Sequence, residues 1–271
     1  RGGRIRGIRT HLRRHGADGG DLHALQPRHA LRHPCDIRLG TRSCPGTGPA
    51  DGEPEALLSP MATSLSEIGY EQALAASGFG PVAGADEAGR GACAGPLVAA
   101  AVILSEDPQD HIEDLHDSKT LTARRRERAF DQIKAHALSW SVVCVGPAEC
   151  DRLGMQEADL QGLRRALLRL DPSPGFALTD GFAVAGLPVP GLGMWKGDRV
   201  CACVSAASIV AKVTRDRLMV RAAQQFPVYG FEIHKGYATK LHQERLEALG
   251  PSAIHRRSYA NVRRAARLNE S

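Results

Sequence analysis

The sequence predicts an α/β fold in which a mixed β-sheet carries helices. The first observation is an apolar run that includes Val82 and leads into two adjacent acids, Asp86 and Glu87, and then a glycine turn. A second apolar run, residues 97–104, follows the turn, so we expect two strands joined as a hairpin. The second observation is that later strand-like runs alternate with amphipathic stretches, which is typical of helices packed on a sheet.

Periodicity and helix-start residues define the expected elements. Residues 156–170 form the clearest helix because leucines recur there at helical spacing, and residues 123–138 follow a threonine suited to cap a helix. Residues 200–221 are rich in Ala and Ser, which permits close backbone packing. The other expected elements are helices at 66–76, 239–249 and 255–267, strands at 139–145 and 176–181, and a loop at 188–193.

Charge and composition limit the class of protein. The 271 residues have a formal net charge of +5, and residues 1–60 contribute +4 of it through ten Arg against six acids. The remaining chain is therefore not a strongly basic nucleic-acid binder, and any basic surface on it must be local. No apolar run approaches the ~18 residues of a membrane span. The seven cysteines lack zinc-ligand spacing, so we expect a cytoplasmic, monomeric protein with buried, reduced thiols.

Residues 1–60 differ from the rest of the chain. They are rich in Arg, Gly, Pro and His, a composition that predicts disorder. The segment is either an RNA-binding Arg/Gly tail or foreign to the natural protein, and the second interpretation is favoured because Met61 resembles an ordinary start. We expect one folded domain over residues 61–271, with a helical C-terminal part at 226–271.

Four acids stand at expected strand ends or glycine turns: Asp86, Glu87, Asp180 and Asp198. Carboxylate oxygens suit Mg²⁺ and Mn²⁺, and two such ions close together activate water for phosphodiester hydrolysis. Without a cation, clustered carboxylates repel and take up protons. For each acid alone, an ordinary turn or surface loop is the commoner explanation. Only the Asp86-Glu87 pair before Gly-Arg-Gly is specific by itself.

Several motifs together resemble those of the ribonuclease HII family. The opening motif spans residues 84–91, Gly-Ala-Asp-Glu-Ala-Gly-Arg-Gly, and is followed by Gly95-Pro96. The further motifs, in that family's order, are Asp117-Ser118-Lys119, Thr179-Asp180-Gly181, Lys196-Gly197-Asp198, residues 205–216, residues 229–237 and His255-Arg256-Arg257-Ser258. The similarity covers residues 82–264, and so many motifs in register make chance implausible.

The resemblance implies a ribonuclease H-like fold: a mixed five-stranded sheet flanked by helices, with a helical C-terminal extension. It implies an endonuclease that cleaves RNA in RNA–DNA hybrids and cuts 5′ of a ribonucleotide embedded in duplex DNA, leaving 3′-hydroxyl and 5′-phosphate ends. Such an enzyme serves ribonucleotide removal from DNA. Mn²⁺ or Mg²⁺ would be the cofactor, with Asp86, Glu87 and Asp180 as its ligands and Asp198 as the fourth catalytic acid.

The same resemblance assigns substrate contacts. Gly89, Arg90 and Gly91 would read the ribose hydroxyl through exposed backbone groups and grip phosphate through the guanidinium. Tyr237 would stack on the sugar of the following deoxynucleotide. Without the resemblance, a half-buried core ring is the preferred interpretation of Tyr237.

Basic residues offer a possible phosphate track. The candidates are Lys119, Lys196, Lys212, Lys235 and the Arg256-Arg257 pair. The arginines at 124–128 are expected to form a solvated face. Asp216, also in a family motif, is expected to pair with Arg215 or Arg217 and has a lesser claim to catalysis.

Two other functions stay open. Another two-metal nuclease or an integrase on the same fold would need the same acids, but not the Gly-Arg-Gly turn together with Tyr237. A non-catalytic nucleic-acid-binding module is disfavoured, because bare carboxylates repel phosphate.

Overall fold

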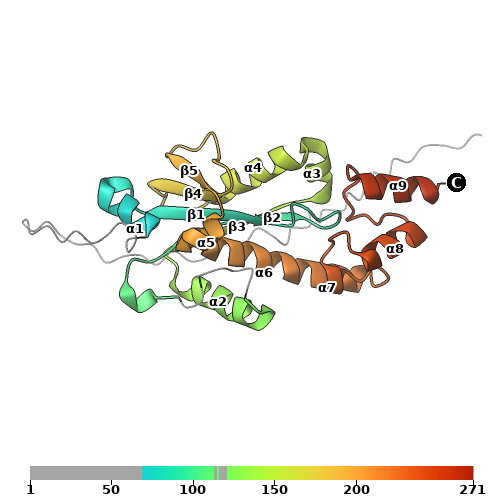
Figure 1. The fold of residues 1–271 in the computed structure, drawn as a ribbon, viewed down its shortest axis with the longest axis horizontal. Coiled ribbons are helices and arrows are strands. Elements are labelled where there is room, and N and C mark those ends of the chain that lie inside the picture. The colour runs from blue at the N-terminus through green and yellow to red at the C-terminus, as the bar shows by residue number, and fades with distance from the viewer. Residues whose placement is uncertain (1–68, 113–114, 116–120, 271) are drawn as a thin grey trace, which may run out of the picture. The chain divides into compact units, whose positions relative to one another are not determined.

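The computed structural model describes residues 69–112, 115 and 121–270, and its central layer is a mixed five-stranded sheet (Figure 1). In space the strands follow the order β3-β2-β1-β4-β5. Their bounds are β1 Val82–Ala88, β2 Leu97–Ile103, β3 Ser139–Val145, β4 Phe176–Asp180 and β5 Gly191–Met194. β2 is antiparallel to β1 and to β3, whereas β4 is parallel to β1 and to β5. This sheet confirms the predicted class and strand number.

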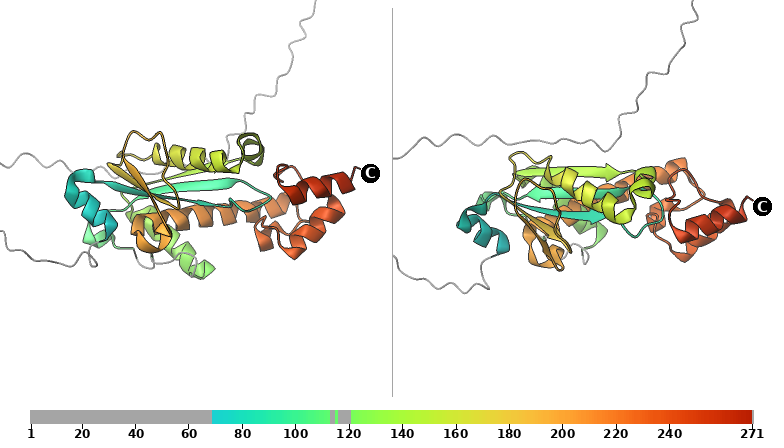
Figure 2. Two further views of the ribbon diagram at one scale, coloured as in Figure 1. Left: turned by 45° about the horizontal axis from the view of Figure 1, so that its top comes forward. Right: turned by 90° about the horizontal axis from the view of Figure 1, so that it is seen from above.

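Helices cover both faces of the sheet, as the views in Figures 1 and 2 show. The helices around the sheet are α1 Tyr70–Leu74, α2 Ala123–His136, α3 Pro147–Leu153, α4 Met155–Leu167, α5 Gly197–Val200 and α6 Ala202–Gln225. Side chains alternate between the faces of a strand. Val98 and Ala100 of β2 therefore pack in the core beneath α2 and α6, and Leu97 and Ala99 pack beneath α4.

Three short helices follow the C-terminal end of α6 (Figure 1). They are α7 Phe231–His234, α8 Lys240–Leu249 and α9 Ala260–Leu268. The Thr239 hydroxyl caps α8 by accepting a hydrogen bond from the His242 backbone N–H at 3.3 Å, as predicted. Among the described residues, no helix is both long and apolar enough to cross a membrane.

Two predicted elements are wrong. Residues 191–194, expected in a loop, form β5, a glycine-containing edge strand whose outer side is exposed, so it lacks the apolar alternation that reveals a strand. The last helix begins at Ala260 and not at His255, because His255 instead forms a β-bridge with Ala94. Residues 1–60, the start of the helix expected at 66–76, and Lys119 lie outside the described residues.

Gly84 of β1 lets α6 lie directly on the sheet. A Cβ atom at Gly84 would be 2.1 Å from the carbonyl carbon of Cys203 and 2.3 Å from the backbone nitrogen of Val204. Both contacts are with backbone atoms, which cannot rotate away. The small-residue run of α6 matches this approach, since Ala206 and Ala207 are fully buried against the same face. The position of α6 over β1 thus depends on a missing side chain.

We predict that Gly84→Ala destabilises the protein by roughly 3 kcal/mol, because overpacking against backbone forces α6 off the sheet. The measurement is the free energy of unfolding from a urea titration. Gly91→Ala is the matched control, because a Cβ there meets nothing within 4 Å. Equal stability of the Gly84 and Gly91 variants would contradict the close packing.

Candidate active site

Asp86 and Glu87 lie near the end of β1 and point to opposite faces of the sheet. Asp86 faces α6, where the Ser208 side chain hydrogen-bonds to it. Glu87 faces α4, where the negative charge of Asp159 acts on it. The strand includes both acids and ends at Ala88. Their position on the central strand makes both acids largely buried.

Asp180 ends β4 beside these acids. The parallel register pairs Ala85 with Thr179, so Asp86 and Asp180 occupy the next position on two neighbouring strands. The charge of Asp180 acts on both Asp86 and Glu87. Asp180 Oδ1 also accepts a hydrogen bond of 2.8 Å from the Gly197 backbone N–H at the start of α5. That bond brings the next residue, the buried Asp198, to the same end of the sheet.

Burial and mutual repulsion disfavour ionisation of this cluster. Burial, followed by the charge of Glu87, raises the pKa of Asp86 well above its usual value, although the Ser208 hydrogen bond lowers it. Burial, followed by the charge of Asp159, raises the pKa of Glu87 to about 7. These carboxyls lie where nearby protein cations do not fully compensate them.

The donor set suits a hard divalent cation. Asp86, Glu87 and Asp180 offer only oxygen atoms, which Mg²⁺ and Mn²⁺ prefer. Within the described ranges, no three His, Cys, Asp or Glu side chains already converge closely enough to hold an ion. The residue types and burial fit a metal, and the side chains would have to converge on it.

Asp159 is an acid of this region that the sequence analysis missed. It lies on α4 with its side chain fully buried, and Arg90 Nη1 lies 3.2 Å from Asp159 Oδ2. Burial raises the Asp159 pKa to about 6, against the opposing effect of Arg90. A signal was present, because Asp159 shares the helical spacing of the buried residues Gly162 and Leu163.

The Gly89-Arg90-Gly91 turn closes the site. Gly89 has φ 93°, and a Cβ there would be 1.9 Å from Arg215 Nε, so both conformation and space require glycine. The Arg90 guanidinium lies over the Phe182 ring, 5.3 Å from its centroid, and 42% of its side chain is exposed. Gly91 is exposed and leaves its backbone open to a ligand.

Two buried arginines donate hydrogen bonds to backbone carbonyl oxygens of this turn and of the residues that follow it. Arg256 Nη1 donates to the carbonyl oxygens of Gly89 at 2.8 Å and Arg90 at 3.1 Å. Arg215 Nε donates to the carbonyl oxygen of Pro96 at 3.0 Å. Arg256 is fully buried, so its predicted place in an exposed phosphate track is wrong. It shapes the turn because its guanidinium binds backbone carbonyls.

Tyr237 is partly exposed, and buried residues contact its ring and its backbone. Its ring is 37% exposed and lies over the Arg215 guanidinium, 5.3 Å from the ring centroid. Its carbonyl oxygen is an acceptor only, so His242 Nδ1 must donate to it across 2.9 Å. His242 Nε2 then accepts from His255 Nε2 at 3.0 Å. Burial lowers the pKa of His242 to about 4 and of His255 to about 3, so both rings stay neutral at pH 7.

The predicted basic track is only partly in place. Lys212 Nζ pairs with Asp216 Oδ1 at 2.7 Å, so Lys212 is the partner of Asp216 and the expected pairing with Arg215 or Arg217 is wrong. Lys235 donates to the Glu232 carbonyl oxygen. Lys196 lies beside the exposed Trp195 ring, 5.9 Å from its centroid.

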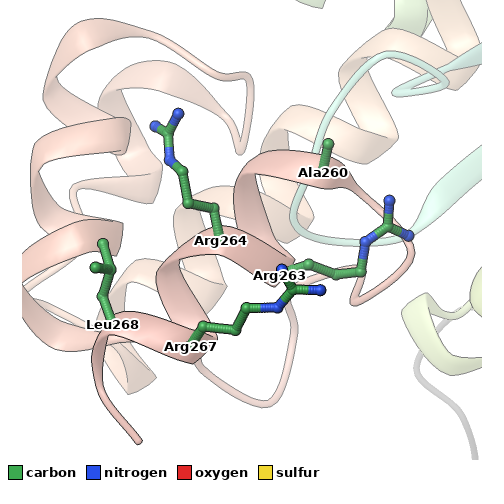
Figure 3. A pocket seen from close by; sticks show the side chains of 5 residues that line it. All are labelled: Ala260, Arg263, Arg264, Arg267 and Leu268. Atoms are coloured by element: carbon green, nitrogen blue, oxygen red, sulfur yellow. The ribbon is translucent and has the colours of Figure 1, made fainter. Parts of the chain in front are cut away.

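A hollow of about 440 Å³ lies away from the acids, on α9 (Figure 3). The described residues that line it belong to this one helix and are Ala260, Arg263, Arg264, Arg267 and Leu268, of which the three arginines project from the helix. Arg264 pairs with Glu247 of α8 at 2.6 Å. Within the described part of the chain no carboxylate lines the hollow, so the chemistry of the acid cluster does not belong there.

The sheet order and its covering helices define a ribonuclease H-like fold, and solved structures agree. The ribonuclease H2 from Pyrococcus horikoshii OT3 is 31% identical with a TM-score of 0.63, over 70% of this chain and 99% of that chain. A crystal structure of Bst-RNase HIII in complex with Mn²⁺, at 19% identity and a TM-score of 0.58, covers 73% of this chain and 74% of that chain and shares the fold.

Sequence comparison gives the family. The ribonuclease HII family model matches residues 83–262. A ribonuclease HII of Cutibacterium acnes is 65% identical over 204 residues, which is 75% of this chain and all of that relative. The chain belongs to the ribonuclease HII family, and it is a ribonuclease H: an endonuclease that cleaves the RNA strand of RNA–DNA hybrids.

We predict that Asp86→Asn raises the unfolding free energy of the metal-free protein at pH 8 by roughly 1–3 kcal/mol, the usual cost of a buried polar group left uncompensated. A folded-state pKa above the unfolded value favours folding at low pH, and that contribution is lost as pH rises through the folded pKa. The gain should therefore shrink toward pH 4. Denaturant titrations in EDTA at both pH values measure it.

Asp131→Asn is the matched control, because Asp131 is an exposed acid on α2. It should change stability little at either pH. A destabilised Asp86→Asn variant at pH 8 would show that the carboxylate is compensated within the protein.

Proposed function

We propose that the acids at the ends of β1 and β4 hydrolyse a phosphodiester 5′ of a ribonucleotide, with divalent cations as cofactor. The observation that carries this proposal is the placement of Asp86 beside Asp180 next to the Gly-Arg-Gly turn. Ribonucleases of this family depend on a divalent metal, and the RNase HIII of the same fold was solved with Mn²⁺. We propose Mn²⁺ or Mg²⁺ here, because the ligands are all carboxylates.

Asp86, Glu87 and Asp180 would hold the metal, with Asp198 as the fourth acid. The cations supply an activated water and neutralise the departing oxygen when they are bound. Asp86 lies on the central strand between β2 and β4, and its carboxylate would be one of those that hold the cations. Water adds to phosphorus as the bond to the 3′ oxygen breaks, so the products carry a 3′-hydroxyl and a 5′-phosphate.

Recognition of the ribose would fall to the turn and to Tyr237. The exposed Gly91 would present backbone groups to a 2′-hydroxyl, whereas the buried Gly89 has only its N–H to offer because its carbonyl oxygen already accepts from Arg256. Arg90 would present a half-exposed guanidinium to a phosphate. The exposed Tyr237 ring is available to stack on the next sugar. The remaining described candidates for phosphate contacts are Lys196, Lys212, Lys235 and Arg257.

We further propose that the enzyme acts as a cytoplasmic monomer on both RNA–DNA hybrids and duplex DNA with embedded ribonucleotides. The described cysteines, Cys93, Cys144, Cys150, Cys201 and Cys203, are free thiols, which suits a reducing compartment.

We predict that Asp86→Asn lowers cleavage of a duplex containing one ribonucleotide at least ~10³-fold, because removing one carboxylate disables the metal site. Binding to the duplex should persist, since the basic and turn residues are unchanged. Gel-based cleavage with Mn²⁺ and an equilibrium binding assay measure the two properties. Near-normal cleavage by this variant would refute the proposed role of Asp86.

A second prediction concerns Tyr237. Tyr237→Ala should lower cleavage at a single embedded ribonucleotide roughly 10-fold or more, since stacking on one nucleotide contributes on the order of 1–3 kcal/mol. Binding to all-DNA duplex should change much less. Tyr70→Ala is the matched control, because Tyr70 is an exposed tyrosine on α1. Unchanged cleavage at the embedded ribonucleotide would remove Tyr237 from the site.

A further inference from the structure

Asp159 has no evident role in packing. Its side chain lies at the buried face of α4, where its neighbours at helical spacing are Gly162 and Leu163. Among the described residues, neither carboxylate oxygen has a conventional hydrogen bond. An acid without hydrogen bonds is a costly choice for such a position, where a neutral side chain would suffice. The ion pair with Arg90 is therefore the interaction that accounts for it.

Arg90 is fixed at three places: its backbone carbonyl oxygen, the flat face of its guanidinium and the nitrogen Nη1 of that group. The Arg90 carbonyl oxygen accepts hydrogen bonds from Arg256 Nη1 and the Tyr259 hydroxyl. The guanidinium lies over the Phe182 ring. Asp159 Oδ2 then lies 3.2 Å from Nη1. These contacts come from α4, the segment just before α9 and the loop after β4, so three separate parts of the chain fix Arg90, two of them at its guanidinium.

A competitor for this guanidinium lies nearby. The charge of Arg90 acts on Glu87 as well as on Asp159. If the Asp159 carboxylate were neutral, Glu87 would be the negative group left to attract Arg90. A guanidinium drawn onto Glu87 would occupy an acid that the cofactor needs and would leave the place where a phosphate must pass.

We propose that Asp159 is a positioning residue that fixes the Arg90 guanidinium beside the Gly-Arg-Gly turn and keeps it away from Glu87. The inference rests on the proposed function, in which Arg90 grips a substrate phosphate. Asp159 itself does not touch the substrate. Its effect on cleavage therefore passes entirely through Arg90.

A double-mutant cycle tests this dependence. Asp159→Asn should lower kcat/KM for a duplex with one embedded ribonucleotide roughly tenfold, as expected when a charge-assisted contact is lost. In an Arg90→Ala background, the same change should alter kcat/KM less than about twofold, because coupled residues are not additive. Glu157→Gln is the matched control: it neutralises an exposed acid on the same helix and should have no effect.

An equal loss from Asp159→Asn in both backgrounds would overturn the proposal, and so would no loss in the wild-type background. A readout without catalysis is proton exchange of the Arg90 guanidinium in the metal-free protein, followed by NMR and assigned with Arg90→Ala. Exchange should accelerate at least about fivefold in Asp159→Asn, since the ion pair protects those protons. Unchanged exchange would also overturn the proposal, even in a variant that cleaves poorly.

The NMR result separates this inference from the proposed function. An active Asp86→Asn enzyme would defeat the proposed function, whereas the exchange rates of Arg90 would be unaffected by that outcome.

Discussion

Repulsion between carboxylates on adjacent strands is the constraint on which the rest of the structure depends. β1 and β4 are parallel neighbours in register, so Asp86 and Asp180 must lie side by side. β1 is central, and helices on both faces bury its acids. Such a cluster opposes folding unless protons or cations compensate it. The acids at the ends of β1 and β4 therefore destabilise the folded protein at the position where a bound cation would neutralise them.

The protein's own buried cations do not relieve this repulsion. Arg256 and Arg215 are fully buried near the site, yet they donate hydrogen bonds mainly to backbone carbonyl oxygens of residues 89–96. They make the glycine turn rigid and leave the carboxylates to an external ion. Arg90, whose charge acts on Glu87, is itself paired with Asp159. Arg215 and Arg256 thus fix the backbone of the turn, and they do not neutralise the carboxylates. This division is consistent with a site preorganised to bind a metal ion and a nucleic-acid phosphate.

The sequence predicted the elements whose signals are local. Strand periodicity and glycine turns predict β1 and β2, and the strand-end positions of Asp86, Glu87 and Asp180 predict that these acids lie near one another, which the sheet register confirms. The sequence pattern did not predict the features that depend on contacts between distant parts of the chain. β5 lacks apolar alternation because it is an exposed edge strand, and Arg256 reads as a surface cation although it is buried by bonds to a turn more than 160 residues earlier. Asp159 was overlooked because an acid on an amphipathic helix normally faces solvent.

The central claim is that these acids converge on divalent cations. Anomalous diffraction from crystals equilibrated with Mn²⁺ tests it most directly, because scattering from manganese locates the ion independently of any assumption about ligands. We expect an anomalous peak within coordination distance of the Asp86 and Asp180 carboxylates, with their side chains rotated toward it. Peaks confined to other parts of the molecule, with both carboxylates unmoved, would contradict it.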